Sequence, residues 1–92
     1  MRMIIGRQFI IRGRVQGVGF RYFAIRAARE LGIVGTVRNM PDGSVEAIAE
    51  GDAEAITKFR LDLERGPSYS HVTGVEEAPR QVTARYRGFE IV

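Results

Sequence analysis

The 92-residue sequence contains no cysteine and only one histidine, His71. Without cysteine, the chain can form neither disulfide bonds nor thiolate nucleophiles. Protein zinc sites take three or four ligands from cysteine, histidine or carboxylate side chains, and a single histidine does not favour such a site. We therefore predict a protein without a metal centre.

Long apolar runs are also missing. Residues 1–6 lack the apolar segment of a signal peptide, and no stretch approaches the roughly 20 apolar residues that cross a bilayer. We therefore expect a cytoplasmic protein without membrane partners. The length leaves no room for a second hydrophobic core, so we expect residues 1–92 to form a single domain.

Lysine is nearly absent, because Lys58 is the only lysine among 14 basic residues and all the others are arginines. The net charge is +3, and arginine pairs readily with phosphate groups, including those of nucleic acids. A GC-rich genome or a warm habitat produces the same arginine bias. The charge alone therefore does not decide between a phosphate ligand, a nucleic acid and neither.

The pattern of apolar side chains predicts the fold. Residues 7–15 alternate, with Phe9 and Ile11 on one face and more polar side chains on the other, which indicates a half-buried strand. The same reasoning gives the other elements as a helix at 20–31, strands at 34–39 and 44–50, a helix at 53–65, and strands near 71–77 and 86–91. We expect Pro79 and residues 80–83 to form the turn between the last two strands.

This order predicts an α+β, ferredoxin-like βαββαβ sandwich. One apolar and one polar face on each strand favour an antiparallel sheet of four to five strands with two helices on one face. The side chains that we expect on the outward face of the sheet are Gln8, Arg12, Glu46 and Glu50.

One candidate site lies where the first predicted strand meets the first helix, in the segment Gly13–Arg21. A glycine-rich turn can direct successive backbone N–H groups into one concavity, and the helix N-terminus adds partial positive charge. Arg21 could close this cup around an anion. A loop of this kind is more often only a tight connection, and neither the dinucleotide fingerprint nor the Walker motif is complete here.

The second candidate is Asn39, which ends a predicted strand just before the turn Pro41-Asp42-Gly43. Its amide could bind a ligand or a water molecule. On its chemistry alone, an asparagine at this place could equally support the turn through side-chain hydrogen bonds.

Both segments resemble the signatures of the acylphosphatase family. Gly13–Arg21 matches the first signature at every fixed position, and Gly35–Gly51 resembles the second. The matching positions of the second signature are Asn39, Gly43, Val45 and Gly51. Gly66-Pro67 and residues 88–91 also resemble family features, so the similarity spans essentially the whole chain.

The resemblance implies the ferredoxin-like fold and the hydrolysis of acyl phosphates to a carboxylate and inorganic phosphate. It implies that Arg21 and the backbone amides of the loop bind the phosphate, and that Asn39 positions the attacking water. The loop residues concerned are Gln16, Gly17, Val18, Gly19, Phe20 and Arg21. It also implies a small-molecule substrate, no cofactor, no metal and no phosphoenzyme, and we expect a monomer.

One position departs from the family pattern. The family usually carries an aromatic residue where this chain has Thr36. Threonine keeps the preference for a strand but offers less surface for packing. The substitution therefore bears on the local packing of this strand, and on the rate, more than on the family assignment.

Other polar and aromatic residues have simpler explanations. We expect His71 to be structural or solvent-facing, Asp42 to serve its turn, and Glu46 to lie on an exposed strand face rather than to form an acid–base pair with Asp42. We expect ordinary packing for the three tyrosines, which are Tyr22, Tyr69 and Tyr86.

Two alternatives come from other functional classes. RNA-recognition modules share the βαββαβ plan, but they carry stacking aromatics on the open sheet face, where this sequence has polar side chains. The chain could also be a non-catalytic ligand sensor or an acylphosphatase-like domain of a larger maturation enzyme. Because the sequence starts and ends close to one domain and has no zinc-finger cysteines, we expect a free-standing enzyme.

Overall fold

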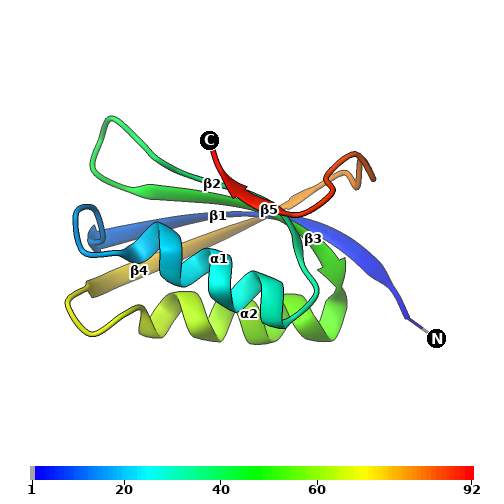
Figure 1. Cartoon of the computed structure of the whole chain (residues 1–92), viewed down its shortest axis with the longest axis horizontal. Coiled ribbons are helices and arrows are strands. Elements are labelled where there is room, and N and C mark those ends of the chain that lie inside the picture. Colours follow the sequence, from blue (N-terminus) through cyan, green and yellow to red (C-terminus); the bar gives the residue numbers. More distant parts are fainter. Residues whose placement is uncertain (1) are drawn as a thin grey trace.

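The computed structural model describes residues 2–92 as one five-stranded sheet with two helices packed on one of its faces (Figure 1). The elements are β1 (Ile4–Arg14), α1 (Phe20–Glu30), β2 (Val34–Asn39), β3 (Val45–Asp52), α2 (Ala53–Arg65), β4 (His71–Arg80) and β5 (Phe89–Ile91). This arrangement confirms the predicted α+β, ferredoxin-like fold.

The strands follow the order β4-β1-β3-β2-β5 across the sheet. Neighbouring strands are antiparallel except β2 and β5, which run parallel, with Gly35 opposite Phe89. The sheet is therefore mixed and not antiparallel throughout. The cause is the route of the chain after β4, because residues 81–88 cross to the opposite edge of the sheet and enter β5 in the direction of β2.

The hydrophobic core lies between the sheet and the two helices. Its largest fully buried side chains include four phenylalanines, which are Phe9, Phe20, Phe59 and Phe89. The ring of Phe59 on α2 meets Phe9 of β1 edge-on at 5.8 Å between centroids and Phe89 of β5 at 5.7 Å. These contacts tie α2 to both a central strand and the C-terminal edge strand.

One expectation about the C-terminal part is wrong. Pro79 does not belong to a turn but lies in β4, opposite Arg7 of β1, and β4 continues to Arg80. β4 is an edge strand that pairs only with β1, so a residue without a backbone N–H is tolerated there. The final strand is correspondingly short and begins at Phe89.

The predicted polar face of β3 is not exposed. Glu46 and Glu50 retain only 8% and 4% of their accessible surface, so the expectation that they lie on an exposed face is wrong. Glu46 accepts hydrogen bonds from Gln8 and Arg38 on the flanking strands. Glu50 accepts three hydrogen bonds from the segment 81–88, which folds over this end of the open face. The two glutamates of this inner strand are thus covered by the residues that donate hydrogen bonds to them.

Candidate functional site

The loop between β1 and α1 has the backbone shape of an anion cradle. Gly17 and Gly19 have positive φ angles of 73° and 80°. Residues with a Cβ adopt such angles only at a cost in free energy. No atom lies within 4 Å of where a Cβ would stand at either residue, so the glycines serve the backbone geometry and not close packing. Both ends of the loop are fixed in the core, since Val15 and Phe20 are each 1% exposed.

Helix α1 begins directly after this loop, at Phe20. The first backbone hydrogen bond that closes the helix runs from the N–H of Phe23 to the carbonyl of Gly19, at 3.0 Å. The preceding amides, including those of Phe20 and Arg21, lie ahead of the helical ladder. Gly19 provides no side-chain cap, and the first turn contains no acidic residue that could compete for these donors. The loop thus combines free amides with the positive end of the helix dipole.

Arg21 lies in the first turn of α1 and is half-buried. Within residues 2–92, its guanidinium forms no ion pair with a carboxylate. A guanidinium at this place adds a fixed positive charge with several N–H donors to the donors of the loop.

Asn39 is the last residue of β2 and is exposed. The turn that follows is closed by hydrogen bonds from the N–H of Met40 to the carbonyl of Ser44 (2.8 Å) and from the N–H of Gly43 to the carbonyl of Met40 (3.1 Å). These bonds hold the strand end that carries Asn39 in a defined position.

Asp42 braces the same turn. Its carboxylate accepts hydrogen bonds from the hydroxyl (2.6 Å) and the backbone N–H (3.0 Å) of Ser44, and it pairs with Arg12 of β1 at 3.2 Å. The bonds from Ser44, with Arg12 as a further cause, lower the pKa of the Asp42 carboxyl to about 2. This agrees with the expectation that Asp42 serves the turn, because such a carboxylate is a poor general base.

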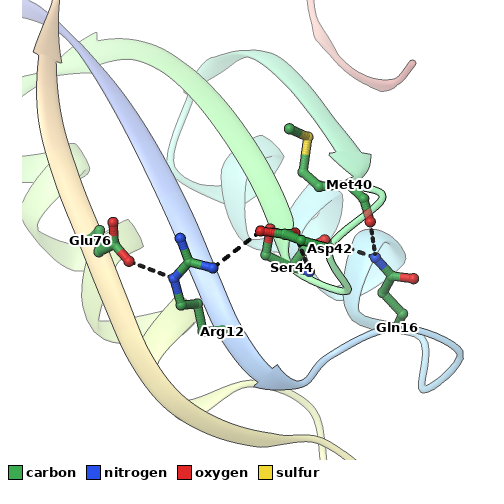
Figure 2. A network of polar contacts seen from close by, with 6 residues as sticks. All are labelled: Arg12, Gln16, Met40, Asp42, Ser44 and Glu76. Atoms are coloured by element: carbon green, nitrogen blue, oxygen red, sulfur yellow. Dashed lines mark hydrogen bonds and ion pairs between the residues drawn. The ribbon is translucent and has the colours of Figure 1, made fainter.

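The two candidate segments are joined by one side chain. The amide nitrogen of Gln16, in the loop after β1, donates to the carbonyl oxygens of Met40 (2.8 Å) and Ser44 (2.9 Å) in the turn after β2 (Figure 2). The glycine loop and the strand end with Asn39 therefore lie side by side. The sequence did not reveal this role of the Gln16 side chain, since a polar residue in a loop carries no signal for its partner.

The remaining polar residues do not form a second centre. Among residues 2–92, no group of three or more histidine, cysteine or carboxylate side chains is placed to hold a metal ion. His71 begins β4 and is exposed, as expected. Glu46 is engaged with Gln8 and Arg38 and not with Asp42.

Among residues 2–92, the strands place no aromatic side chain on the open face of the sheet. The aromatic residues of the five strands, Phe9 and Phe89, are both fully buried in the core, and the three tyrosines lie outside the strands. This is not the stacking surface of an RNA-recognition module. The structure also contains, between residues 2 and 92, no helix long and apolar enough to cross a membrane.

Thr36 borders a hollow at the junction of β2 and β5. A cavity of about 270 Å³ is lined there by Thr36, Tyr86 and their neighbours in the segment that leads to β5. Thr36 and Tyr86 are both half-buried. The position that is usually aromatic in the family thus lies beside open space with a tyrosine on its border.

Comparison with known proteins decides the family. The acylphosphatase family model matches residues 7–91, which include both candidate segments. The chain belongs to the acylphosphatase family. The acylphosphatase of Methylococcus capsulatus is 45% identical over 83 residues, covering 90% of each chain.

Solved structures agree with this assignment of the family. The crystal structure of the Bacillus subtilis acylphosphatase superposes with a TM-score of 0.92 at 37% identity, covering 98% of this chain and 99% of that one. The crystal structure of full-length HypF in its phosphate- and nucleotide-bound form also matches, with a TM-score of 0.91 and 31% identity. That match covers all of this chain but 12% of HypF, so the same fold also occurs within a much longer protein.

Proposed function

We propose that this member of the acylphosphatase family hydrolyses the carboxylic–phosphoric anhydride bond of small acyl phosphates, giving a carboxylate and inorganic phosphate. In this proposal residues 1–92 act as a single, monomeric and cytoplasmic domain. The observation that carries it is the meeting of two segments, the glycine loop with Arg21 and the strand end with Asn39, held together by the Gln16 side chain.

The phosphoryl group is held by the loop. Its oxygens accept hydrogen bonds from the backbone amides of residues 16–21 and from the guanidinium of Arg21. The αL glycines, the uncapped helix N-terminus and the lack of an acidic residue in the first turn of α1 support this role. Such an arrangement recognises a phosphate-sized dianion through positive potential and directed donors.

The water is held by Asn39. The acyl phosphate already has a good carboxylate leaving group, so the enzyme mainly has to orient water in line with the bond that breaks. The exposed side-chain amide of Asn39 is the available group at the strand end, and a phosphate oxygen of the substrate accepts the proton of the water. No metal ion and no phosphoenzyme is needed in this sequence of steps.

Hydrolysis of benzoyl phosphate tests the proposal. The purified protein should release inorganic phosphate at the same rate with and without excess EDTA. An enzyme that loses activity in EDTA and regains it with magnesium or zinc would contradict the mechanism. A protein that binds phosphate but releases none from benzoyl phosphate would instead be a non-catalytic sensor.

A further inference from the structure

The side chain of Gln16 makes an unusual pair of contacts. Both hydrogen bonds start from the same atom, Nε2, and end on two carbonyl oxygens of the turn after β2, those of Met40 and Ser44. Because carbonyl oxygens only accept, the orientation of the amide is fixed, with nitrogen toward the turn. Gln16 thus uses both of its N–H groups on a single neighbouring segment.

These two carbonyls are also the ones that close the turn. Ser44 O accepts from the N–H of Met40, and Met40 O accepts from the N–H of Gly43. Each carbonyl therefore has one partner within the turn and a second in the phosphate loop. Ser44 is 4% exposed, whereas Gln16 and Met40 are half-buried, so the part of this junction at Ser44 is shielded from water that could replace Gln16.

The junction lies next to Asn39, the residue proposed to position the attacking water. Met40 directly follows Asn39, and within residues 2–92 the side chain of Asn39 has no hydrogen-bond partner of its own. Its place relative to the phosphate loop is therefore set by its backbone, which is held by the pairing with Val45 of β3 and by the turn that follows. We propose that Gln16 is a positioning residue, whose side chain sets the distance and orientation of Asn39 relative to the phosphate loop. This inference rests on the proposed function of Asn39.

The test replaces Gln16 with methionine, which keeps the length of the side chain but removes both donors. We expect kcat for benzoyl phosphate to fall by about 10- to 100-fold, because small displacements of a positioning group cost rates of this order. The inhibition constant of inorganic phosphate should change less than about threefold, since Arg21 and the loop amides remain. A second variant, Gln16→Glu, keeps the shape and replaces the donors by acceptors. It should lower kcat as Gln16→Met does, but its negative charge in the loop should also weaken phosphate binding, so only Gln16→Met should leave the inhibition constant nearly unchanged.

The matched control is Gln8→Met. Gln8 also donates one side-chain hydrogen bond of 2.8 Å, to Glu46 of β3, and its side chain makes no hydrogen bond to the loop or the turn within residues 2–92. Its loss should leave kcat within about twofold. Each variant is assayed well below its own melting temperature, so that a loss of stability does not appear as a loss of rate.

A double-mutant cycle decides whether Gln16 acts through Asn39. In the background of Asn39→Ala, the further change Gln16→Met should reduce kcat by less than twofold, since the group that it positions is gone. If the double variant lost kcat by the product of the two single-variant losses, the two residues would act independently and the inference would be overturned. A normal kcat in Gln16→Met would overturn it as well. Should Asn39→Ala itself keep a normal kcat, the proposed function of Asn39 fails, which is a distinct outcome.

Discussion

The replacement Glu50→Gln should destabilise the fold without affecting the site. Glu50 is 4% exposed, and its two carboxylate oxygens accept hydrogen bonds from the N–H (2.9 Å) and hydroxyl (2.9 Å) of Thr83 and from the N–H of Ala84 (3.1 Å). Ala84 has a positive φ of 59°, which an alanine adopts only when its surroundings impose it. The carboxylate thus holds a strained segment over the sheet.

The magnitude follows from the number of donors. Glutamine presents one oxygen, so at best it keeps the two bonds from Thr83, now to a neutral acceptor, and turns its NH₂ group toward the N–H of Ala84. Hydrogen bonds to a charged group contribute about 1.5–3 kcal/mol, and an unpaired buried donor costs a comparable amount. We expect a loss of about 2–3 kcal/mol at pH 7, equivalent to a melting temperature lower by roughly 10–20 °C.

The pH dependence provides a second test of the same contact. Burial alone raises the pKa of Glu50, but the hydrogen bonds from Thr83 and Ala84, with the charge of Arg85, outweigh it and lower the pKa below its ordinary value. A lowered folded-state pKa means that the carboxylate stabilises the fold above its unfolded pKa of about 4.3, and that this contribution is lost as the pH falls through the folded value. The difference between wild type and Glu50→Gln should therefore persist from pH 8 to about 5 and shrink below about pH 4.

Urea unfolding followed by circular dichroism gives the free energy of unfolding at pH 7 and, when repeated between pH 3 and 8, its pH dependence. Thr83→Val, which removes the hydroxyl but keeps the backbone donor, should cost about 1 kcal/mol and serves as a graded companion. Activity should stay near normal in both variants, since Glu50 lies five residues along β3 from Val45, the partner of Asn39. A Glu50→Gln protein within about 0.5 kcal/mol of wild type at pH 7, or an unchanged difference at pH 3, would refute this account of the segment.

Three further predictions concern other parts of the molecule. Thr36→Trp should be tolerated and should stabilise the fold by about 1 kcal/mol, because the adjoining cavity of about 270 Å³ has room for a ring; a clear drop in melting temperature would contradict this. Gly35→Ala should destabilise by roughly 3 kcal/mol or more, since Gly35 has a φ of 147° and an added Cβ would stand 1.8 Å from the carbonyl oxygen of Ile48; a near-normal urea midpoint would refute it. Inorganic phosphate should inhibit competitively, because it occupies the same cradle as the substrate, and an effect on kcat alone would argue against a shared site.

Much of the fold follows from local patterns in the sequence. The predicted bounds of β2 and α2 agree with the structure, since each element ends at strong signals, Pro41-Asp42-Gly43 after β2 and Gly66-Pro67 after α2. The differences arise where distant partners override local preference. Pro79 indicates a turn by itself, but the edge position of β4 accepts it.

The burial of Glu46 and Glu50 has the same kind of cause. Alternation identifies the face of a strand but not what covers it, and here the covering groups are Gln8, Arg38 and the segment 81–88. The proposed site residues were predicted from the family signatures, and their roles stay predictions. The contacts that join the two signatures, from Gln16 to Met40 and Ser44, became visible only in three dimensions.

The division of roles between Arg21 and Asn39 is the central claim, and one set of measurements tests it most directly. For Arg21→Gln and Asn39→Ala, both shown to be folded by circular dichroism, kcat for benzoyl phosphate and the inhibition constant of phosphate are determined. Arg21→Gln should lose phosphate binding and turnover together, because no water or amide replaces its charge. Asn39→Ala should bind phosphate normally and lose at least about 10²–10³ in kcat, the loss typical of one positioned donor. A near-normal kcat in Asn39→Ala, or normal phosphate binding in Arg21→Gln, would contradict the account.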